Sequence, residues 1–177
     1  MLPSLIRPDA LNELAEEARR APQGCLVEVG VYKGGSAWIL DMVGREQNRK
    51  VWLFDTFRGT PHANSKLDVH KKTDFGDVDV EELMAALPDS QLVVGVFPNT
   101  LKDADALGMG RIALAHIDCD QYRSVKACCE SLMKRMVPGG VMIFDDYDAL
   151  PGARQAVDEV FSGRVEMSAQ GKARVRF

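Results

Sequence analysis

Three aspartates stand where the fold of the chain could gather them into one metal site. Asp118 ends one apolar run, and Asp145 and Asp146 end another, with Asp145 lying 27 positions after Asp118. That spacing fits two strands joined by one helical crossover, and a right-handed connection places such strands side by side with their ends on one rim. Three carboxylates there would repel one another, and a hard divalent cation with oxygen ligands, such as Mg²⁺, would relieve the repulsion. In the alternative interpretation, Asp146 caps a turn and Asp118 pairs with an arginine such as Arg123 or Arg154.

A glycine-rich turn, Glu28-Val-Gly-Val-Tyr-Lys-Gly-Gly-Ser36, follows an earlier apolar run. Glycines let the backbone approach a ligand closely, and the helix after such a turn offers free N–H groups to an anion. The spacing differs from the G-x-G-x-x-G of dinucleotide-binding proteins, and the turn lacks the Lys-Ser/Thr ending of a phosphate-binding P-loop. By itself the turn is equally typical of a tight strand-to-helix connection without a ligand.

Asp55 strengthens the case for a ligand at this turn. It ends the next apolar run, where an acidic side chain can accept hydrogen bonds from the hydroxyls of a ribose. We therefore expect an adenosine ligand with an anionic group. S-adenosylmethionine fits, with its carboxylate near Ser36, its ribose at Asp55 and its ammonium at Glu28. Phe97 could stack on the adenine or be an ordinary core aromatic, and Asp55 could instead be a solvated loop acid.

Other polar side chains near these residues have a structural as well as a functional interpretation. Asp120 is expected to cap the helix that follows it, because aspartate is a favoured capping residue. His116 is expected to be a core histidine rather than a ligand, and Tyr122 to pack on the apolar side of its helix. His62 and His70 lie in a long polar loop, where they could reach a substrate but are expected to be solvated.

The pattern of the chain supplies an element to hold each of these residues. Apolar runs of strand length alternate with segments of helical periodicity, which predicts an α/β fold with a mostly parallel sheet and helices on both faces. Ligands of such folds lie beyond the carboxyl ends of the strands, where three of the expected parallel strands end in aspartate. We expect strands over 24–30, 50–55, 91–96, 111–118 and 141–145, helices over 36–43, 79–87, 100–107, 121–136 and 152–161, a helix stop at Pro138-Gly-Gly140, and a terminal antiparallel hairpin over 164–167 and 172–177.

The length of 177 residues fits one domain, 1–177, with an N-terminal helix within 1–22 and an active-site loop over 56–77. The net charge of −4 argues against nucleic acid as a partner, and no apolar run approaches the roughly 18 residues that cross a bilayer. The first residues lack the profile of a signal peptide, and the four cysteines lack zinc-ligand spacing. We therefore expect a cytoplasmic protein with reduced cysteines. A homodimer would help so short a chain to close its site.

Five motifs follow one another along the chain. They are Glu28-Val-Gly-Val-Tyr-Lys-Gly-Gly-Ser36, Phe54-Asp-Thr-Phe-Arg-Gly59, Asp74-Phe-Gly-Asp77, His116-Ile-Asp-Cys-Asp-Gln-Tyr122 and Pro138-Gly-Gly-Val-Met-Ile-Phe-Asp-Asp-Tyr147. Together they resemble the macrocin and mycinamicin O-methyltransferase family (TylF type), over roughly residues 24–161. These enzymes methylate sugar hydroxyls of antibiotics with S-adenosylmethionine and Mg²⁺. The resemblance implies a Rossmann-like class I methyltransferase fold with a seven-stranded sheet.

The resemblance also implies roles for single residues. The turn would hold the methionine end of the cofactor, the end of the second strand its ribose, and the segment 74–77 would approach the adenine. The cofactor-binding residues implied in this way or by the chemistry above are Glu28, Gly30, Tyr32, Gly34, Ser36, Asp55, Thr56 and Phe97. Asp118, Asp145 and Asp146 would hold the metal ion, and Asp118 is also the candidate base.

Two departures from the family pattern leave alternatives open. Catechol-type O-methyltransferases, whose cofactor turn is similar, place a lysine base three residues after the first metal aspartate, where this chain has Gln121. Antibiotic-tailoring enzymes also have a longer N-terminal part that helps to enclose the acceptor. The leading hypothesis is a metal-dependent O-methyltransferase acting on a small acceptor such as a sugar or a glycosylated natural product. The alternatives are a non-catalytic S-adenosyl-ligand binding module and another metal-dependent enzyme of the same fold.

Overall fold

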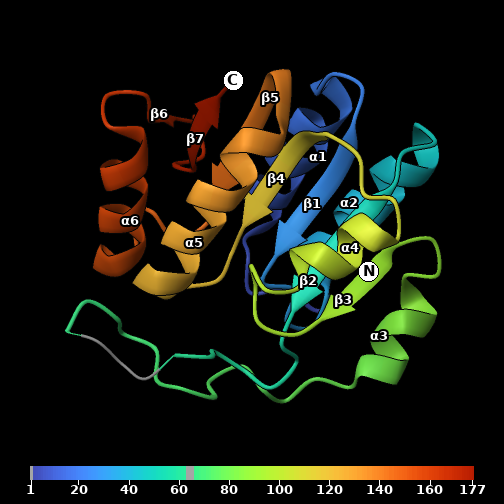
Figure 1. The fold of residues 1–177 in the computed structure, drawn as a ribbon, viewed down its shortest axis with the longest axis horizontal. Helices are drawn as coiled ribbons and strands as arrows, with labels where there is room; N and C mark the ends of the chain where they lie inside the picture. The colour runs from blue at the N-terminus through green and yellow to red at the C-terminus, as the bar shows by residue number, and fades with distance from the viewer. Residues whose placement is uncertain (1, 63–65) are drawn as a thin grey trace.

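The computed structural model describes residues 2–62 and 66–177 and places their strands in one mixed sheet (Figure 1). Five parallel strands follow the order β3-β2-β1-β4-β5, and an antiparallel pair, β7 and then β6, extends the sheet beyond β5. The strands are β1 (Cys25–Val29), β2 (Val51–Asp55), β3 (Gln91–Val94), β4 (Ile112–Ile117), β5 (Met136–Phe144), β6 (Glu166–Met167) and β7 (Ala173–Arg176). This arrangement confirms the predicted α/β fold with a C-terminal antiparallel hairpin.

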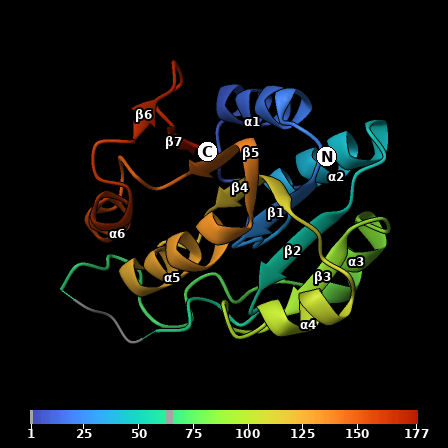
Figure 2. The ribbon, with the colours of Figure 1, turned by 45° about the horizontal axis from the view of Figure 1, so that its top comes forward.

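Helices cover both faces of the sheet (Figure 2). The helices are α1 (Pro8–Arg20), α2 (Gly35–Glu46), α3 (Val80–Ala86), α4 (Leu101–Ala106), α5 (Tyr122–Leu132) and α6 (Pro151–Phe161). Alternate strand residues serve the two faces: in β2, Trp52 and Phe54 pack with α4, α5 and α6, whereas Val51 and Leu53 pack with α1, α2 and α3. Because both faces are buried, the strands are continuous apolar runs in the sequence. Among the helices of the described residues, none has the length and apolar character that crossing a bilayer requires.

The connection between α5 and β5 differs from the expected one. The helix expected over 121–136 is α5 up to Leu132 and then a 3-10 turn, η1 (Met133–Arg135), and β5 begins before the expected residue 141. The Pro138-Gly139-Gly140 segment therefore lies inside β5 instead of stopping a helix. The N–H of Gly139 donates to the carbonyl of Phe177 at 2.6 Å, and the N–H of Phe177 donates to the carbonyl of Gly140 at 3.0 Å. Pairing with the end of the chain thus makes these glycines part of the sheet.

Arg49 fastens the end of α1 to the start of β1. Its guanidinium donates to the backbone carbonyls of Ala18 at 3.1 Å, Ala21 at 3.4 Å, Pro22 at 3.0 Å and Gly24 at 2.8 Å. A charged donor that satisfies several carbonyls at once stabilises an irregular connection strongly, because each of those groups would otherwise be left without a partner on burial.

Candidate active site

A pocket of about 450 Å³ opens at the carboxyl ends of the parallel strands. β1, β2, β4 and β5 each contribute the residue at, or just after, the strand end. Of the cofactor and metal residues expected from the sequence, all except Glu28 line this pocket: Gly30, Tyr32, Gly34, Ser36, Asp55, Thr56, Phe97, Asp118, Asp145 and Asp146. The fold therefore brings the two expected halves of the site, the cofactor turn and the carboxylates, into one space.

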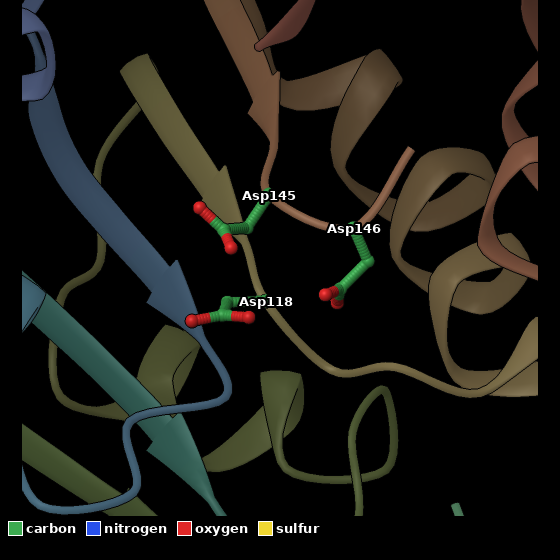
Figure 3. Close-up of side chains that lie close together, drawn as sticks. All are labelled: Asp118, Asp145 and Asp146. Carbon is green, nitrogen blue, oxygen red and sulfur yellow. The ribbon is translucent and has the colours of Figure 1, made fainter. Parts of the chain in front are cut away.

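The side chains of Asp118, Asp145 and Asp146 come together at the ends of β4 and β5, as Figure 3 shows. One oxygen from each carboxylate lies within 4.8 Å of the other two. The cause is the parallel pairing of β4 with β5, which brings the residues after both strands to one edge. Asp146 Oδ2 is buried and has no hydrogen-bond partner among the described residues. Three carboxylates with one such unpaired oxygen fit a hard divalent cation.

The electrostatics of this acidic cluster (Asp118, Asp145 and Asp146) are uneven. Burial, and then the charges of Asp146 and Asp145, raise the pKa of Asp118 well above its usual value. Burial and the charge of Asp145 also raise the pKa of Asp146. The pKa of Asp145 is lowered instead, because the nearby His116 and the hydrogen-bonded ammonium of Lys172 favour its charged form and outweigh its burial. Among the described residues, Asp118 and Asp146 thus lie next to each other without a cationic partner. A bound dication would balance their negative charge.

Glu28, which was expected to meet the cofactor ammonium, is not among the residues that line the pocket. Its side chain is fully buried, and its Oε1 lies 2.7 Å from Nδ1 of His116, its neighbour across the β1–β4 pair. The register of the β1–β4 pair holds it against His116, on the strand face that it shares with Leu26. His116 is the core histidine expected. Burial opposes its charge, but the neighbouring carboxylates of Asp145 and Glu28 raise its pKa to about 10.

Asp55 holds the glycine turn in shape. Its Oδ2 accepts hydrogen bonds from the N–H groups of Val31 at 2.6 Å and Tyr32 at 3.0 Å, and its Oδ1 accepts one from Phe57 at 2.8 Å. It is therefore not the solvated loop acid of the alternative interpretation. A carboxylate has roughly four acceptor positions, so about one remains for a ligand hydroxyl.

Gly30 brings the glycine turn against the strand end that carries Asp118. Its φ is +90°, and a Cβ at this position would lie 1.7 Å from the carbonyl oxygen of Asp118. The N–H of Asp118 in turn donates to the carbonyl of Val29 at 2.9 Å. The turn and the acidic cluster are therefore joined through direct backbone contact, and glycine is required for that contact.

Asp120 is a functional candidate that sequence reasoning undervalued. It does not cap α5, whose N-cap is Gln121 and has no side-chain capping hydrogen bond. Asp120 instead adopts a φ of +57° and lines the pocket. Burial, and then the charges of Asp146 and Asp145, raise its pKa to about 8. The available signal was its place two residues after Asp118, in the loop that leaves a strand at the ligand-binding edge.

The N-terminal segment forms a further wall of the pocket, which no sequence pattern indicated. Pro3, Ser4, Leu5 and Ile6 all line it. Ser4 packs closely on the start of α2. A Cβ added to Gly35 would lie 2.3 Å from the Cβ of Ser4. The missing side chain of Gly35 therefore makes room for this segment.

The described part of the expected loop over 56–77 is docked on the start of α5 through Gln121. The Gln121 amide donates to the carbonyl of His62 at 3.1 Å and to that of His70 at 3.5 Å, and its Oε1 accepts from the N–H of His62 at 3.0 Å. Residues 63–65 of that loop lie outside the described residues. Gln121, which occupies the position of a lysine base in catechol-type enzymes, here positions the loop.

Two aromatic residues near the loop had no expected role in binding: Tyr122 was expected to pack and His70 to be solvated. Tyr122 packs on the core as expected, and its N–H donates to Asp68 Oδ1 at 2.8 Å. His70 lines the pocket and is not simply solvated. Its Nε2 lies 3.7 Å from Asp120 Oδ1, and its ring centroid lies 4.8 Å from that of Phe75.

Thr56 and Phe97 shape the pocket in different ways. The Thr56 hydroxyl donates to the carbonyl of Gly59 at 2.7 Å and so closes the first turn after β2. Phe97 packs edge-on against Phe54, with ring centroids 5.3 Å apart, while also lining the pocket. It is therefore a core aromatic with one side available to a ligand.

The sheet order, with its antiparallel last strands beside β5 and the pocket at its carboxyl edge, is that of the class I methyltransferase fold. The family model for macrocin-O-methyltransferase (TylF) matches residues 6–168. The chain belongs to this family, which confirms the resemblance seen in the sequence motifs.

Two curated relatives show the extent of the match. The chain is 34% identical over 162 residues to 8-demethyl-8-(2,3-dimethoxy-alpha-L-rhamnosyl)-tetracenomycin-C 4'-O-methyltransferase of Streptomyces olivaceus, covering 82% of this chain and 60% of that protein. It is 29% identical over 150 residues to demethyldecarbamoylnovobiocin O-methyltransferase of Streptomyces niveus, covering 77% and 57%. The chain thus spans about three fifths of the length of these relatives.

Solved structures agree on the fold. The O-methyltransferase NovP superposes with a TM-score of 0.82 at 22% identity, covering 98% of this chain and 81% of that one. The calicheamicin methyltransferase CalS11 superposes with a TM-score of 0.81 at 23% identity, covering 95% and 77%. At these identities the likeness is one of architecture.

Proposed function

We propose that this chain transfers the methyl group of S-adenosylmethionine to a hydroxyl of a small acceptor, such as a sugar or a glycosylated natural product, with Mg²⁺ held by the acidic cluster. The observation that carries the proposal is that Asp118, Asp145 and Asp146 converge in the same pocket as the glycine turn. Membership of the TylF family supports it, as does the name of a relative that methylates a rhamnosyl tetracenomycin.

The cofactor turn and its neighbours would bind the methyl donor. S-adenosylmethionine supplies a methyl group on a positively charged sulfur, which is already electrophilic. The first N–H groups of α2, after the uncapped Gly34, suit the carboxylate of the donor. The free acceptor position of Asp55 suits a ribose hydroxyl, and Phe97 offers apolar surface to the adenine. These contacts would orient the methyl group toward the acidic cluster.

The acidic cluster and Asp120 would act on the acceptor. A divalent cation held by Asp118, Asp145 and Asp146 would lower the pKa of an acceptor hydroxyl, which is a poor nucleophile at neutral pH. Asp118 or Asp120 would accept the proton, since both carboxylates line the pocket. Asp120 has the advantage that it lies outside the cluster that holds the cation. Donor and acceptor bound at one sheet edge need little further ordering to reach an in-line geometry.

The test is methyl transfer from S-adenosylmethionine to a panel of glycosides with free vicinal hydroxyls, in Mg²⁺ and in EDTA. Binding of S-adenosylhomocysteine is measured by calorimetry on the same samples. We expect the double variant Asp145→Ala/Asp146→Ala to lose at least about a hundredfold in rate while still binding the product. Asp103→Ala, on the exposed side of α4, is the matched control and should retain both properties.

Each alternative has its own result in this experiment. Undiminished turnover by the double variant in EDTA would refute the metal role. Binding of S-adenosylhomocysteine without turnover of any glycoside would favour the non-catalytic binding module. Cation binding without affinity for S-adenosylhomocysteine would favour a different metal-dependent enzyme on the same fold.

A further inference from the structure

Lys172, on the C-terminal hairpin, reaches the acidic cluster. Its ammonium is hydrogen-bonded to Asp145 Oδ1 and lies 3.1 Å from the backbone carbonyl oxygen of the same residue. The side chains of Lys172 and Asp145 are 19% and 15% exposed, so the contact is largely shielded from water. The proposed mechanism gives this lysine no role, although it contacts one of the three carboxylates that would hold the cation.

The register of the sheet fixes this contact. Phe144 and Ala173 are the last pair of the antiparallel β5–β7 ladder. The residues next to them, Asp145 and Lys172, therefore face each other at its end. The N–H of Ser168 donates to the carbonyl of Lys172 at 2.8 Å, and the N–H of Lys172 donates to the Ser168 hydroxyl oxygen at 2.9 Å. That hydroxyl donates in turn to Glu13 Oε2 on α1 at 2.8 Å. These hydrogen bonds fix the backbone of Lys172 and so the origin of its side chain.

The charges around the cluster leave room for a cation beside this lysine. His116 also lies near the cluster, with Nε2 3.9 Å from Asp145 Oδ1, but its Nδ1 is paired with Glu28 Oε1 at 2.7 Å. Among the described residues, no ion pair involves Asp118 or Asp146. A dication would thus meet two unbalanced carboxylates and a third that it must share with Lys172.

We propose that Lys172 is a positioning residue that holds Asp145 in the metal-free site and competes with the divalent cation for it, so that the C-terminal hairpin sets the cation affinity. The inference rests on the metal site of the proposed function. A fixed ammonium on Asp145 Oδ1 takes up part of the negative charge of that carboxylate and also repels the cation. Removing the ammonium therefore tightens cation binding. By reciprocity, a bound cation releases the ammonium from Asp145.

Calorimetric titration of the full chain with Mn²⁺ and with Mg²⁺ tests the competition. Lys172→Met keeps a long apolar side chain without the charge and should bind both cations at least about tenfold more tightly than the wild type. Lys172→Arg keeps the charge and should stay within about threefold of the wild type. Lys134→Met makes the same change in net charge at an exposed site just before β5, at the end of that strand remote from Asp145, and should leave the affinity unchanged.

A second measurement uses the wild-type protein and does not depend on a variant that folds. Lys172 is acetylated with an amine-reactive reagent in EDTA and in saturating Mn²⁺, and its labelling is measured by peptide mass spectrometry. We expect slow labelling in EDTA and at least about fivefold faster labelling with Mn²⁺. Lys134 serves as the internal reference and should label at one rate in both.

The outcomes separate this inference from the function on which it rests. Equal or weaker cation binding by Lys172→Met, or labelling of Lys172 that Mn²⁺ leaves unchanged, overturns the competition while the proposed function stands. If the wild type and every variant bind S-adenosylhomocysteine but neither cation, the metal site itself is refuted.

Discussion

Replacing Gly30 by alanine tests whether the glycine turn and the acidic cluster are packed against each other through their backbones. The added methyl would lie 1.7 Å from the carbonyl oxygen of Asp118 and 2.5 Å from its carbonyl carbon, and no rotamer change moves these backbone atoms. Displacing packed atoms costs about 1–3 kcal/mol, and the φ of +90° costs an L-residue about a further 1–2 kcal/mol. We therefore expect Gly30→Ala to lose about 2–5 kcal/mol of unfolding free energy, which lowers Tm by roughly 4–20 °C.

Two other glycines separate the backbone strain from the clash. Gly108 has a φ of +83° and nothing within 4 Å of its added Cβ among the described residues, so Gly108→Ala should show strain alone, about 1–2 kcal/mol. Gly110 has neither strain nor a close neighbour in the described part of the chain, and its alanine variant should stay within about 0.5 kcal/mol of the wild type. Urea unfolding followed by circular dichroism gives the three free energies. The reasoning is refuted if Gly30→Ala is no less stable than Gly108→Ala.

Three further predictions follow from single contacts. Arg49→Ala should lower the free energy of unfolding in urea by about 2–4 kcal/mol, because four carbonyls lose a charged donor. Arg49→Lys should lower it less, and equal losses in the two variants would contradict the role of the guanidinium in binding several carbonyls. Gln121→Leu should speed limited proteolysis within 56–77 at least about fivefold without unfolding the core, and an unchanged cleavage rate would show that the amide does not hold the loop. Burial raises the pKa of Cys25 to about 11, so at pH 8 it should react with iodoacetamide at least about a hundredfold more slowly in the native protein than in urea, and the native rate should rise with pH; equal rates at pH 8 would refute its burial.

The central strands and the acidic cluster could be predicted from the sequence because their signals are local. A strand buried on both faces is a continuous apolar run, and β1, β2 and β4 begin and end within about one residue of the expected limits. The rule that parallel neighbours end on one rim then brings Asp118 and Asp145 together without any knowledge of side-chain contacts.

The residues that sequence reasoning missed depend on contacts between distant parts of the chain. Lys172 meets Asp145 only through the register of the antiparallel hairpin, and Ser4 reaches the pocket only because Gly35 leaves room for it. Glu28 also depends on a distant partner, because its burial against His116 is set by the register of the β1–β4 pair. Asp120 was misjudged because a capping preference is statistical, whereas its left-handed backbone is set by the tertiary fold.

The described residues between β2 and α3, 56–62 and 66–79, leave the sheet and return to it without forming a strand. The described part of this segment is held by a few hydrogen bonds, such as those of the Gln121 amide. None of its described residues pairs with a strand of the sheet. Its length and composition can therefore change while every strand keeps its partner. Under the proposed function, changes in this one segment would alter which acceptor is bound and leave the residues proposed for the methyl donor unchanged.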